Sequence, residues 1–174
     1  DSVLIALTKI LSEKPSLVVS GINGGANLGL EEFFTSGTIG AAIEAALHGI
    51  PSIAVSLAIA DLSIKYELDL DSFSKAAIVA REAAKFFLEE DYGSIDILNI
   101  NVPEKADLKK ALITTLAPFS YGDIYRETIA GKYEMIDWRI EEYESSVKDS
   151  DIYAIRSGYI SITPITVSYT HLRA

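Results

Sequence analysis

Short apolar runs alternate with helical patterns along the chain up to residue 103. Three runs rich in β-branched residues, at 16–20, 52–58 and 95–101, have the length and composition of strands buried on both faces. Residues 38–48 and 72–90 lie between them and repeat apolar side chains at helical spacing. Parallel strands need a crossover connection, which in such an alternation is the helix. The sequence therefore predicts an α/β fold with a mostly parallel sheet covered by helices on both faces.

The chain is predicted to divide into four segments, because its character changes after residue 117. The region that follows is polar with scattered aromatic residues, which is typical of an extended hairpin or arm. Exposed aromatic residues on an arm favour a subunit contact, while a hairpin that packs on its own domain is the alternative. The segments are the α/β core at 1–117, the hairpin or oligomerisation arm at 118–150, the closing strand of the core at 151–166, and a tail at 167–174 that resembles frayed or foreign sequence.

The composition of the chain excludes several partners and chemistries. Its 25 acidic and 15 basic side chains give a formal net charge of −10, a field that repels nucleic acid but still allows a small anion in a local pocket. The chain has no cysteine, which excludes disulfides, zinc–thiolate sites and cysteine nucleophiles. No apolar run reaches transmembrane length. We therefore expect a cytoplasmic protein that binds neither nucleic acid nor membrane.

A segment rich in glycine and asparagine, at residues 20–38, follows the first predicted strand. Ligands of a parallel sheet bind beyond the carboxyl ends of its strands, where this segment begins. Its glycines let backbone N–H groups converge on one point, and Asn23 and Asn27 add amide groups. The helix that begins near Ser36 adds unpaired N–H groups and a dipole that favours an anion. The segment predicts a neutral cradle for a phosphoryl group, with simple turn and helix-cap chemistry as the alternative.

This cradle contains no fixed cation. No lysine lies between Val18 and Lys65, and the spacing matches neither the dinucleotide G-x-G-x-x-G pattern nor a P-loop. Charge neutralisation must come from elsewhere, most simply from a divalent metal ion.

Four stretches of the chain are similar, in order, to the motifs of one family. They are PSLVVSGINGGANLG (15–29), TSGTIGAAIEAALHGIPSIAVSL (35–57), LNINVP (98–103) and DIYAIRSGYISITP (151–164). They resemble the SurE family of stationary-phase survival proteins, metal-dependent nucleoside monophosphate phosphatases. The resemblance implies a Rossmann-like three-layer αβα core, a C-terminal extension that forms a homodimer or tetramer, and Mg²⁺ or Mn²⁺ as the cofactor. It also implies hydrolysis of a nucleoside monophosphate, or another small phosphomonoester, in the manner of a 5′-nucleotidase.

The resemblance also implies which residues bind. Asn23 is the implied metal ligand, and the implied phosphate-binding residues are Asn23, Gly24, Gly25, Asn27, Ser36, Gly37 and Thr38. The family's paired metal-binding aspartates, in an Asp-Asp-Gly strand, have no counterpart here. We therefore expect the catalytic residues to lie outside this chain and the chain alone to be inactive; a non-catalytic nucleotide- or phosphate-binding module is the alternative. Glu31 and Glu32 are candidate substitute ligands, although solvated loop charges are the favoured interpretation.

Overall fold

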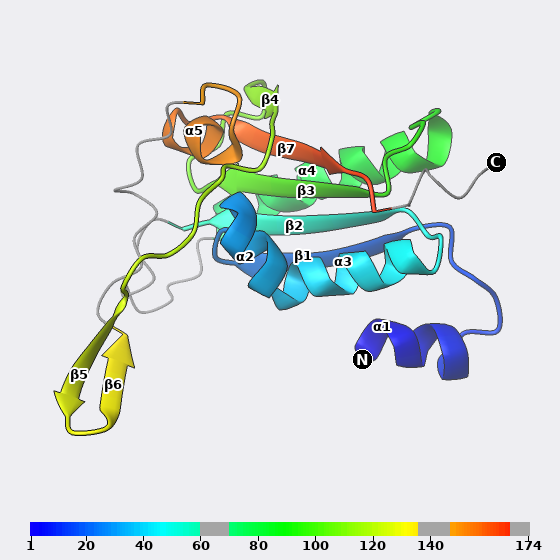
Figure 1. The fold of residues 1–174 in the computed structure, drawn as a ribbon. Coiled ribbons are helices and arrows are strands. Elements are labelled where there is room, and N and C mark those ends of the chain that lie inside the picture. The colour runs from blue at the N-terminus through cyan, green and yellow to red at the C-terminus, as the bar shows by residue number, and fades with distance from the viewer. Residues whose placement is uncertain (60–69, 136–146, 168–174) are drawn as a thin grey trace, which may run out of the picture.

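The computed structural model describes residues 1–59, 70–135 and 147–167 (Figure 1). Its central strands are β1 (Val18–Gly24), β2 (Ser52–Ala58), β3 (Ile97–Pro103), β4 (Ala111–Ile113) and β7 (Ile160–Ile165). They form one five-stranded sheet in the order β1-β2-β3-β7-β4. β1, β2 and β3 run parallel, β7 is antiparallel to β3, and β4 is parallel to β7. The predicted α/β fold with a mostly parallel sheet is confirmed.

Helices cover both faces of this sheet, as predicted (Figure 1). Within the described residues, the helices are α1 (Ser2–Ile5), the π-helix η1 (Ala6–Ile10), α2 (Gly29–Thr35), α3 (Gly37–Leu47), α4 (Leu70–Glu89) and α5 (Asp151–Arg156). α4 packs on one face, whereas α2 and α3 lie on the other. None of the helices in the described ranges is long and apolar enough to cross a bilayer.

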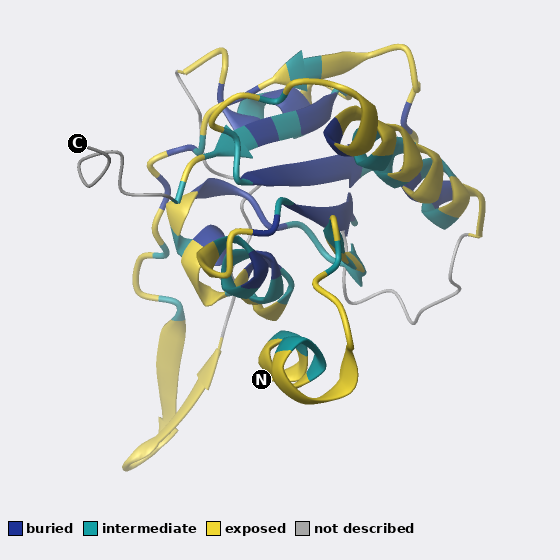
Figure 2. Cartoon of the chain, turned by 90° about the vertical axis from the view of Figure 1, so that its right-hand side faces the viewer, coloured by how far each residue is buried: buried dark blue, intermediate teal, exposed yellow. Residues whose placement is uncertain are grey.

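The central strands are buried because the helices cover them on both sides (Figure 2). Every residue of β2 is buried, and so is β3 up to Val102. On one face, Ile53 and Ile100 of these strands pack against Phe87 of α4. On the other face, α3 contributes Ile39 to a second apolar cluster. The continuous apolar runs of the sequence thus correspond to strands buried on both sides.

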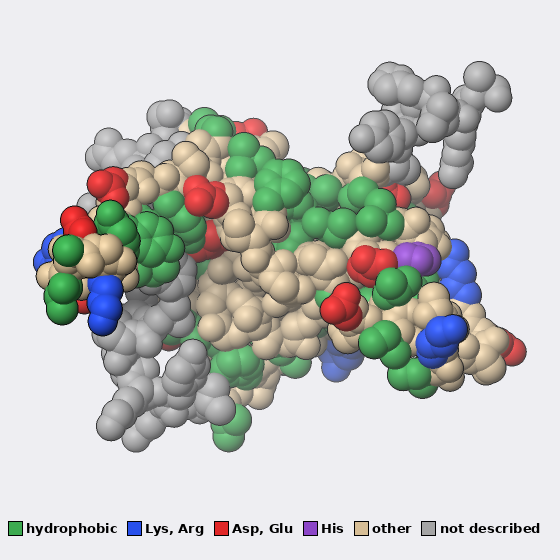
Figure 3. Space-filling model, turned by 60° about the horizontal axis from the view of Figure 1, so that its bottom comes forward, with side chains coloured by type: hydrophobic (Ala, Val, Ile, Leu, Met, Phe, Trp, Pro, Cys, Tyr) green, Lys and Arg blue, Asp and Glu red, His purple; other side chains and the backbone are tan. Residues whose placement is uncertain are grey.

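β5 (Tyr125–Ile129) and β6 (Lys132–Met135) form a separate antiparallel hairpin. The hairpin projects from the core in Figure 1, and every residue of both strands is exposed. Figure 3 shows it on the left, with hydrophobic, basic and acidic side chains side by side. The hairpin lies inside the predicted arm, of which residues 136–146 fall outside the described residues, as does the tail from residue 168. The four-segment division and the role of the arm between subunits stay predictions.

Part of the predicted closing strand is wrong, because residues 151–156 form the helix α5. Ser150 is the N-cap of α5, and its Oγ accepts a hydrogen bond from the Tyr153 N–H at 3.2 Å. Gly158, with φ of 75°, follows the last turn in the left-handed conformation that commonly ends a helix. β7 then supplies the strand that closes the core.

The helix α2 occupies residues for which the sequence indicates only a loop. Its N-cap, Leu28, has no side chain that could cap the first turn. The N–H of Gly29 instead donates to the Asp151 carboxylate at 2.7 Å, and the N–H of Leu30 donates to the Ala117 carbonyl at 3.0 Å. The partners that stabilise the start of α2 therefore come from distant parts of the chain.

Candidate phosphate-binding site

Polar side chains from three parallel strands lie in one row near the carboxyl ends of those strands. Asn23 of β1 pairs with Ser56 of β2, and Ser56 pairs with Asn101 of β3. Residues paired in this way project to the same face of a sheet. Ala54, two residues before Ser56, packs with Ile39, so the row faces α3. Figure 1 shows α2 and the start of α3 at this end of the sheet.

Asn27 lies over this row and is hydrogen-bonded to it on several sides. Its Nδ2 donates to Ser56 Oγ at 2.6 Å, and its backbone N–H donates to Asn101 Oδ1 at 2.8 Å. Its carbonyl accepts from Nδ2 of Asn99 and from Nδ2 of Asn101, at 3.0 Å each. Only 4% of Asn27 is exposed. Asn27 therefore anchors the loop between β1 and α2, and its contact with phosphate stays a prediction.

Asn23 presents a free oxygen beside the glycines. Its Nδ2 donates to the Gly25 carbonyl at 2.8 Å, while its Oδ1 has no hydrogen bond to any described residue. Gly24 is the last residue of β1, and the Gly25 N–H donates to the Leu57 carbonyl at 3.0 Å. The Gly25 N–H thus continues the sheet pairing and is not free for a ligand. Of this group, the Asn23 Oδ1 is the atom left open to one.

The start of α3 combines a helix cap with exposed groups. Ser36 is the N-cap, and its Oγ accepts from the N–H groups of Thr38 at 3.2 Å and Ile39 at 3.4 Å. Ser36 therefore caps α3, and its contact with phosphate stays a prediction. Gly37 is exposed and occupies the first helical position, where the N–H has no acceptor within the helix. The Gly37 N–H and the hydroxyls of Ser36 and Thr38 remain capable of donating to an anion.

Two buried carboxylates lie beside the loop, and Glu32 is not the solvated charge that the sequence favours. Glu32 is 6% exposed and accepts from the Leu28 N–H at 2.8 Å and from the Tyr121 hydroxyl at 2.7 Å. Asp151 is fully buried and accepts from the N–H groups of Gly29 and Ala117. Burial raises the pKa of both carboxyls, and burial together with the Glu32 hydrogen bond raises the pKa of Tyr121.

These two carboxylates stabilise the loop. They are not available as metal ligands, because their oxygens already accept hydrogen bonds from protein N–H and O–H groups. The described residues contain no group of three or more His, Cys, Asp or Glu that could hold a metal ion. A divalent cation of the magnesium type prefers about six oxygen ligands, of which Asn23 Oδ1 would supply one. The set of ligands needed for a metal ion is therefore not complete within the described residues.

Sequence reasoning identified the loop but missed the side chains that hold it. Asn99 and Asn101 belong to the predicted strand 95–101 and to the LNINVP motif, but neither was predicted as a site residue. The signal that could have revealed them is the presence of two asparagines on one face of an otherwise apolar central strand. Asp151 gave no such signal, since its partners Gly29 and Ala117 are backbone groups far along the chain. The distant partner of Glu32 is the Tyr121 hydroxyl, which the sequence does not indicate either.

The fold defines an α/β protein with a mostly parallel sheet, a class of proteins whose ligands commonly bind beyond the carboxyl ends of the parallel strands. Residues 1–123 match the family described as "Survival protein SurE". The chain belongs to the SurE family, and the resemblance drawn from its motifs is confirmed.

Several relatives are named 5′-nucleotidase SurE. The chain is 42% identical to that of Archaeoglobus fulgidus over 173 residues, which cover 98% of this chain and 66% of the relative. It is also 42% identical to that of Methanocaldococcus jannaschii over 176 residues, which cover 98% and 65%. The crystal structure of the SurE protein from Aquifex aeolicus superposes with a TM-score of 0.72 at 28% identity, over 98% of this chain and 67% of that one. The chain thus spans just under two thirds of the length of these two curated relatives.

Proposed function

We propose that this chain acts in the hydrolysis of nucleoside monophosphates to nucleoside and phosphate, as a metal-dependent phosphomonoesterase of the 5′-nucleotidase type. The observation that carries the proposal is the free Asn23 Oδ1 at the carboxyl end of β1, on the sheet face where α3 begins with the exposed Gly37 and the half-buried Ser36 and Thr38. The names of the relatives favour the same activity.

The phosphoryl group would be bound by groups with hydrogens to donate. These are the Gly37 N–H at the start of α3 and the hydroxyls of Ser36 and Thr38, supported by the positive end of the helix dipole. Asn27 would shape the loop from below. Gly25, which carries no side chain, would leave room for the substrate above it. A Cβ at Gly24 would instead lie 3.8 Å from Phe73 of α4, on the other face of the sheet.

A divalent metal ion, Mg²⁺ or Mn²⁺, is part of the proposal, with Asn23 Oδ1 as a ligand. Such an ion would neutralise charge on the phosphoryl oxygens, which no lysine of the loop can do. The described residues do not complete its coordination, so no step of the reaction is assigned to it. The incomplete ligand set favours a second candidate function, a module that binds a nucleotide or phosphate without hydrolysing it.

The hairpin β5–β6 is proposed as a subunit contact in a homodimer or tetramer. Its exposed apolar side chains are Tyr125, Ile129, Tyr133 and Met135. Aromatic residues and Met are enriched at protein interfaces. Size-exclusion chromatography of the chain with and without residues 125–135 tests the contact, and an unchanged oligomeric state would reject it.

The test of the function separates binding from turnover. Phosphate release from AMP and GMP is measured with Mg²⁺ and with Mn²⁺ on the full-length protein that contains this chain, because the catalytic residues are expected outside it. AMP binding is measured by calorimetry under the same conditions. Asn23→Ala should weaken both. Thr35→Ala should change neither, because the Thr35 hydroxyl is exposed and donates to the Glu31 carbonyl within α2. Binding without release would favour the non-catalytic module, and absence of both would reject the proposal.

A further inference from the structure

The two asparagines of LNINVP are buried where apolar side chains would be expected. Asn99 and Asn101 have no exposed surface and point to the same face of β3 as Ile97, which packs in an apolar cluster. A polar side chain in such a position costs free energy unless it is hydrogen-bonded. The presence of both asparagines must therefore be explained by the groups that they bind.

Both asparagines bind the backbone of the same residue, Asn27. Asn101 accepts from the Asn27 N–H with Oδ1 and donates to the Asn27 carbonyl with Nδ2, at 2.8 and 3.0 Å. One side-chain amide thus pairs with the donor and the acceptor of a single residue, as a neighbouring strand would. Asn99 Nδ2 adds a second donor to that carbonyl at 3.0 Å.

These bonds hold the middle of the loop, while other groups hold its two ends. The Gly25 N–H continues the pairing of β1 with β2. The N–H groups of Leu28 and Gly29 are held by the carboxylates of Glu32 and Asp151. Between these ends, the backbone of Asn27 is held by β3 side chains.

Asn99 keeps its donor at a cost to stability. Its Oδ1 is buried and has no hydrogen-bond partner among the described residues. Leaving such a buried oxygen unpaired costs free energy, and this cost offsets the net gain from the one hydrogen bond that the amide donates. The amide is therefore explained better by the geometry of the loop than by the free energy of unfolding.

We infer that Asn99 and Asn101 are positioning residues, which hold the Asn27 backbone and thereby set the loop that carries Asn23 and the glycines. Neither residue touches the ligand in this assignment. The part that concerns the ligand rests on the proposed function, whereas the part that concerns the loop does not.

The test uses Asn101→Asp and Asn99→Val in the complete chain. An aspartate at 101 keeps an acceptor for the Asn27 N–H but turns an oxygen toward the Asn27 carbonyl. A valine at 99 removes one donor and fills most of the volume, so it serves if Asn101→Asp does not fold. The matched control is Thr163→Val on β7, because Thr163 is buried, is paired with Asn99, and bonds to Thr114 and not to Asn27.

Two measurements keep the inference separate from the proposed function. Amide hydrogen exchange without ligand should be about tenfold faster over residues 25–28 in both asparagine variants, the amount expected from loss of one or two net hydrogen bonds. The affinity for inorganic phosphate should fall by a similar factor, about tenfold. Thr163→Val should change neither the exchange of the loop amides nor the phosphate affinity, even if its melting temperature falls as much as that of the asparagine variants.

Each outcome decides one of the two claims. Loop exchange in Asn101→Asp and Asn99→Val that matches Thr163→Val would overturn the positioning role. Faster loop exchange with unchanged phosphate affinity would limit the role to the structure of the loop and overturn its link to the ligand. Wild-type chain that binds no phosphate would count against the proposed function, and the exchange measurement would still decide the inference.

Discussion

The two faces of the central sheet bury different kinds of side chain. Toward α4, strands β2 and β3 present Val55, Ile100 and their apolar neighbours. Toward α2 and α3, the same strands bury Ser56, Asn99 and Asn101. The first face gains its free energy from the removal of apolar surface from water. On the second face, part of the buried area belongs to polar side chains that form hydrogen bonds with a loop.

This difference indicates which face of such a sheet can carry a ligand-binding loop. A loop of irregular backbone needs partners for its N–H and carbonyl groups when it lies over a buried surface. Apolar strand positions cannot supply them, but amide and hydroxyl side chains can. The glycine-rich loop therefore lies over the polar face, and α4 packs over the apolar one. The following predictions test this division, from the largest expected effect to the smallest.

The largest effect is expected on the apolar face, from Ile100→Ala. Ile100 is fully buried and lies between Asn99 and Asn101 on β3, so it tests the opposite face at the same level of the sheet. The cavity should lower the free energy of unfolding by about 2–5 kcal/mol in urea titrations. The phosphate affinity of the folded protein should not change. A loss of affinity like that expected for Asn101→Asp would show that the faces are not separable.

A smaller loss is expected where the loop meets α2, from Gly29→Ala. Gly29 has φ of 67°, and a Cβ there would lie 2.8 Å from the Phe119 Cβ and 3.3 Å from the Ala117 oxygen. Backbone strain and this close contact should cost about 1–3 kcal/mol of unfolding free energy.

Gly37→Ala is the matched control for that substitution. A methyl group at Gly37 would have no heavy atom of another element within 4 Å, and the residue does not have a positive φ. Alanine there should leave the stability unchanged or raise it by up to about 1 kcal/mol, because alanine is the better helix former. Equal losses in the two variants would mean that the tight packing around Gly29 does not determine the stability of the loop.

The apolar face was predictable from the sequence, and much of the polar face was not. β2 matches the predicted 52–58 because continuous burial leaves an unbroken apolar run. The loop around Asn23 was found because glycine and asparagine mark unusual backbone. Asn99 and Asn101 were missed as loop partners, since the residue that they bind lies more than 70 positions earlier. α2 was missed for the same reason, because its first N–H groups bond to residues near 117 and 151.

A third effect is a dependence of stability on pH that comes from the polar face. Burial raises the pKa of Glu32 above its ordinary value of 4.5. The folded chain then keeps this proton at pH values where the unfolded chain has lost it, so low pH favours the fold. That contribution is lost as the pH rises through the folded pKa, with a slope of at most about 1.4 kcal/mol per pH unit. Urea titrations in a pH series above 4.5 measure it.

Two variants should move that slope in opposite directions. Glu32→Gln removes the titrating group but keeps an acceptor for the Leu28 N–H. The unfolding free energy of wild type minus that of this variant should therefore fall as the pH rises, by the amount predicted for Glu32. Tyr121→Phe removes a hydrogen bond that lowers the pKa of Glu32, so its slope should be steeper. A Glu32→Gln curve parallel to wild type at every pH would contradict the assignment.

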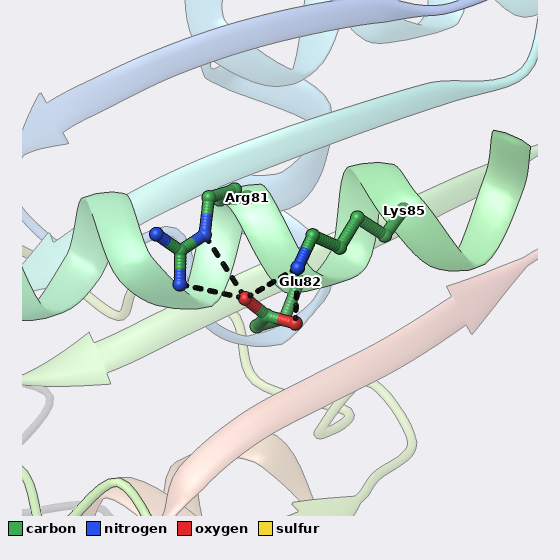
Figure 4. A network of polar contacts seen from close by, with 3 residues as sticks. All are labelled: Arg81, Glu82 and Lys85. Carbon is green, nitrogen blue, oxygen red and sulfur yellow. Dashed lines mark hydrogen bonds and ion pairs between the residues drawn. The ribbon is translucent and has the colours of Figure 1, made fainter.

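The smallest effect is expected on the outer surface of α4. There Glu82 Oε1 accepts from Arg81 Nε at 3.0 Å, and Lys85 Nζ lies 3.4 Å from both Glu82 oxygens (Figure 4). The hydrogen bond from Arg81, followed by that from Lys85, lowers the pKa of Glu82. Water and salt screen such exposed pairs, so their number says little about stability.

Glu82→Gln should therefore leave the urea midpoint unchanged within error, at low and at high salt. The same helix contributes Phe87 to the buried apolar face, so burial, and not the count of contacts, decides which of its residues stabilise the fold. A midpoint shift as large as that of Gly29→Ala would contradict this. The exposed charges of α4 would then contribute to the stability of the fold, as the two buried faces of the sheet do.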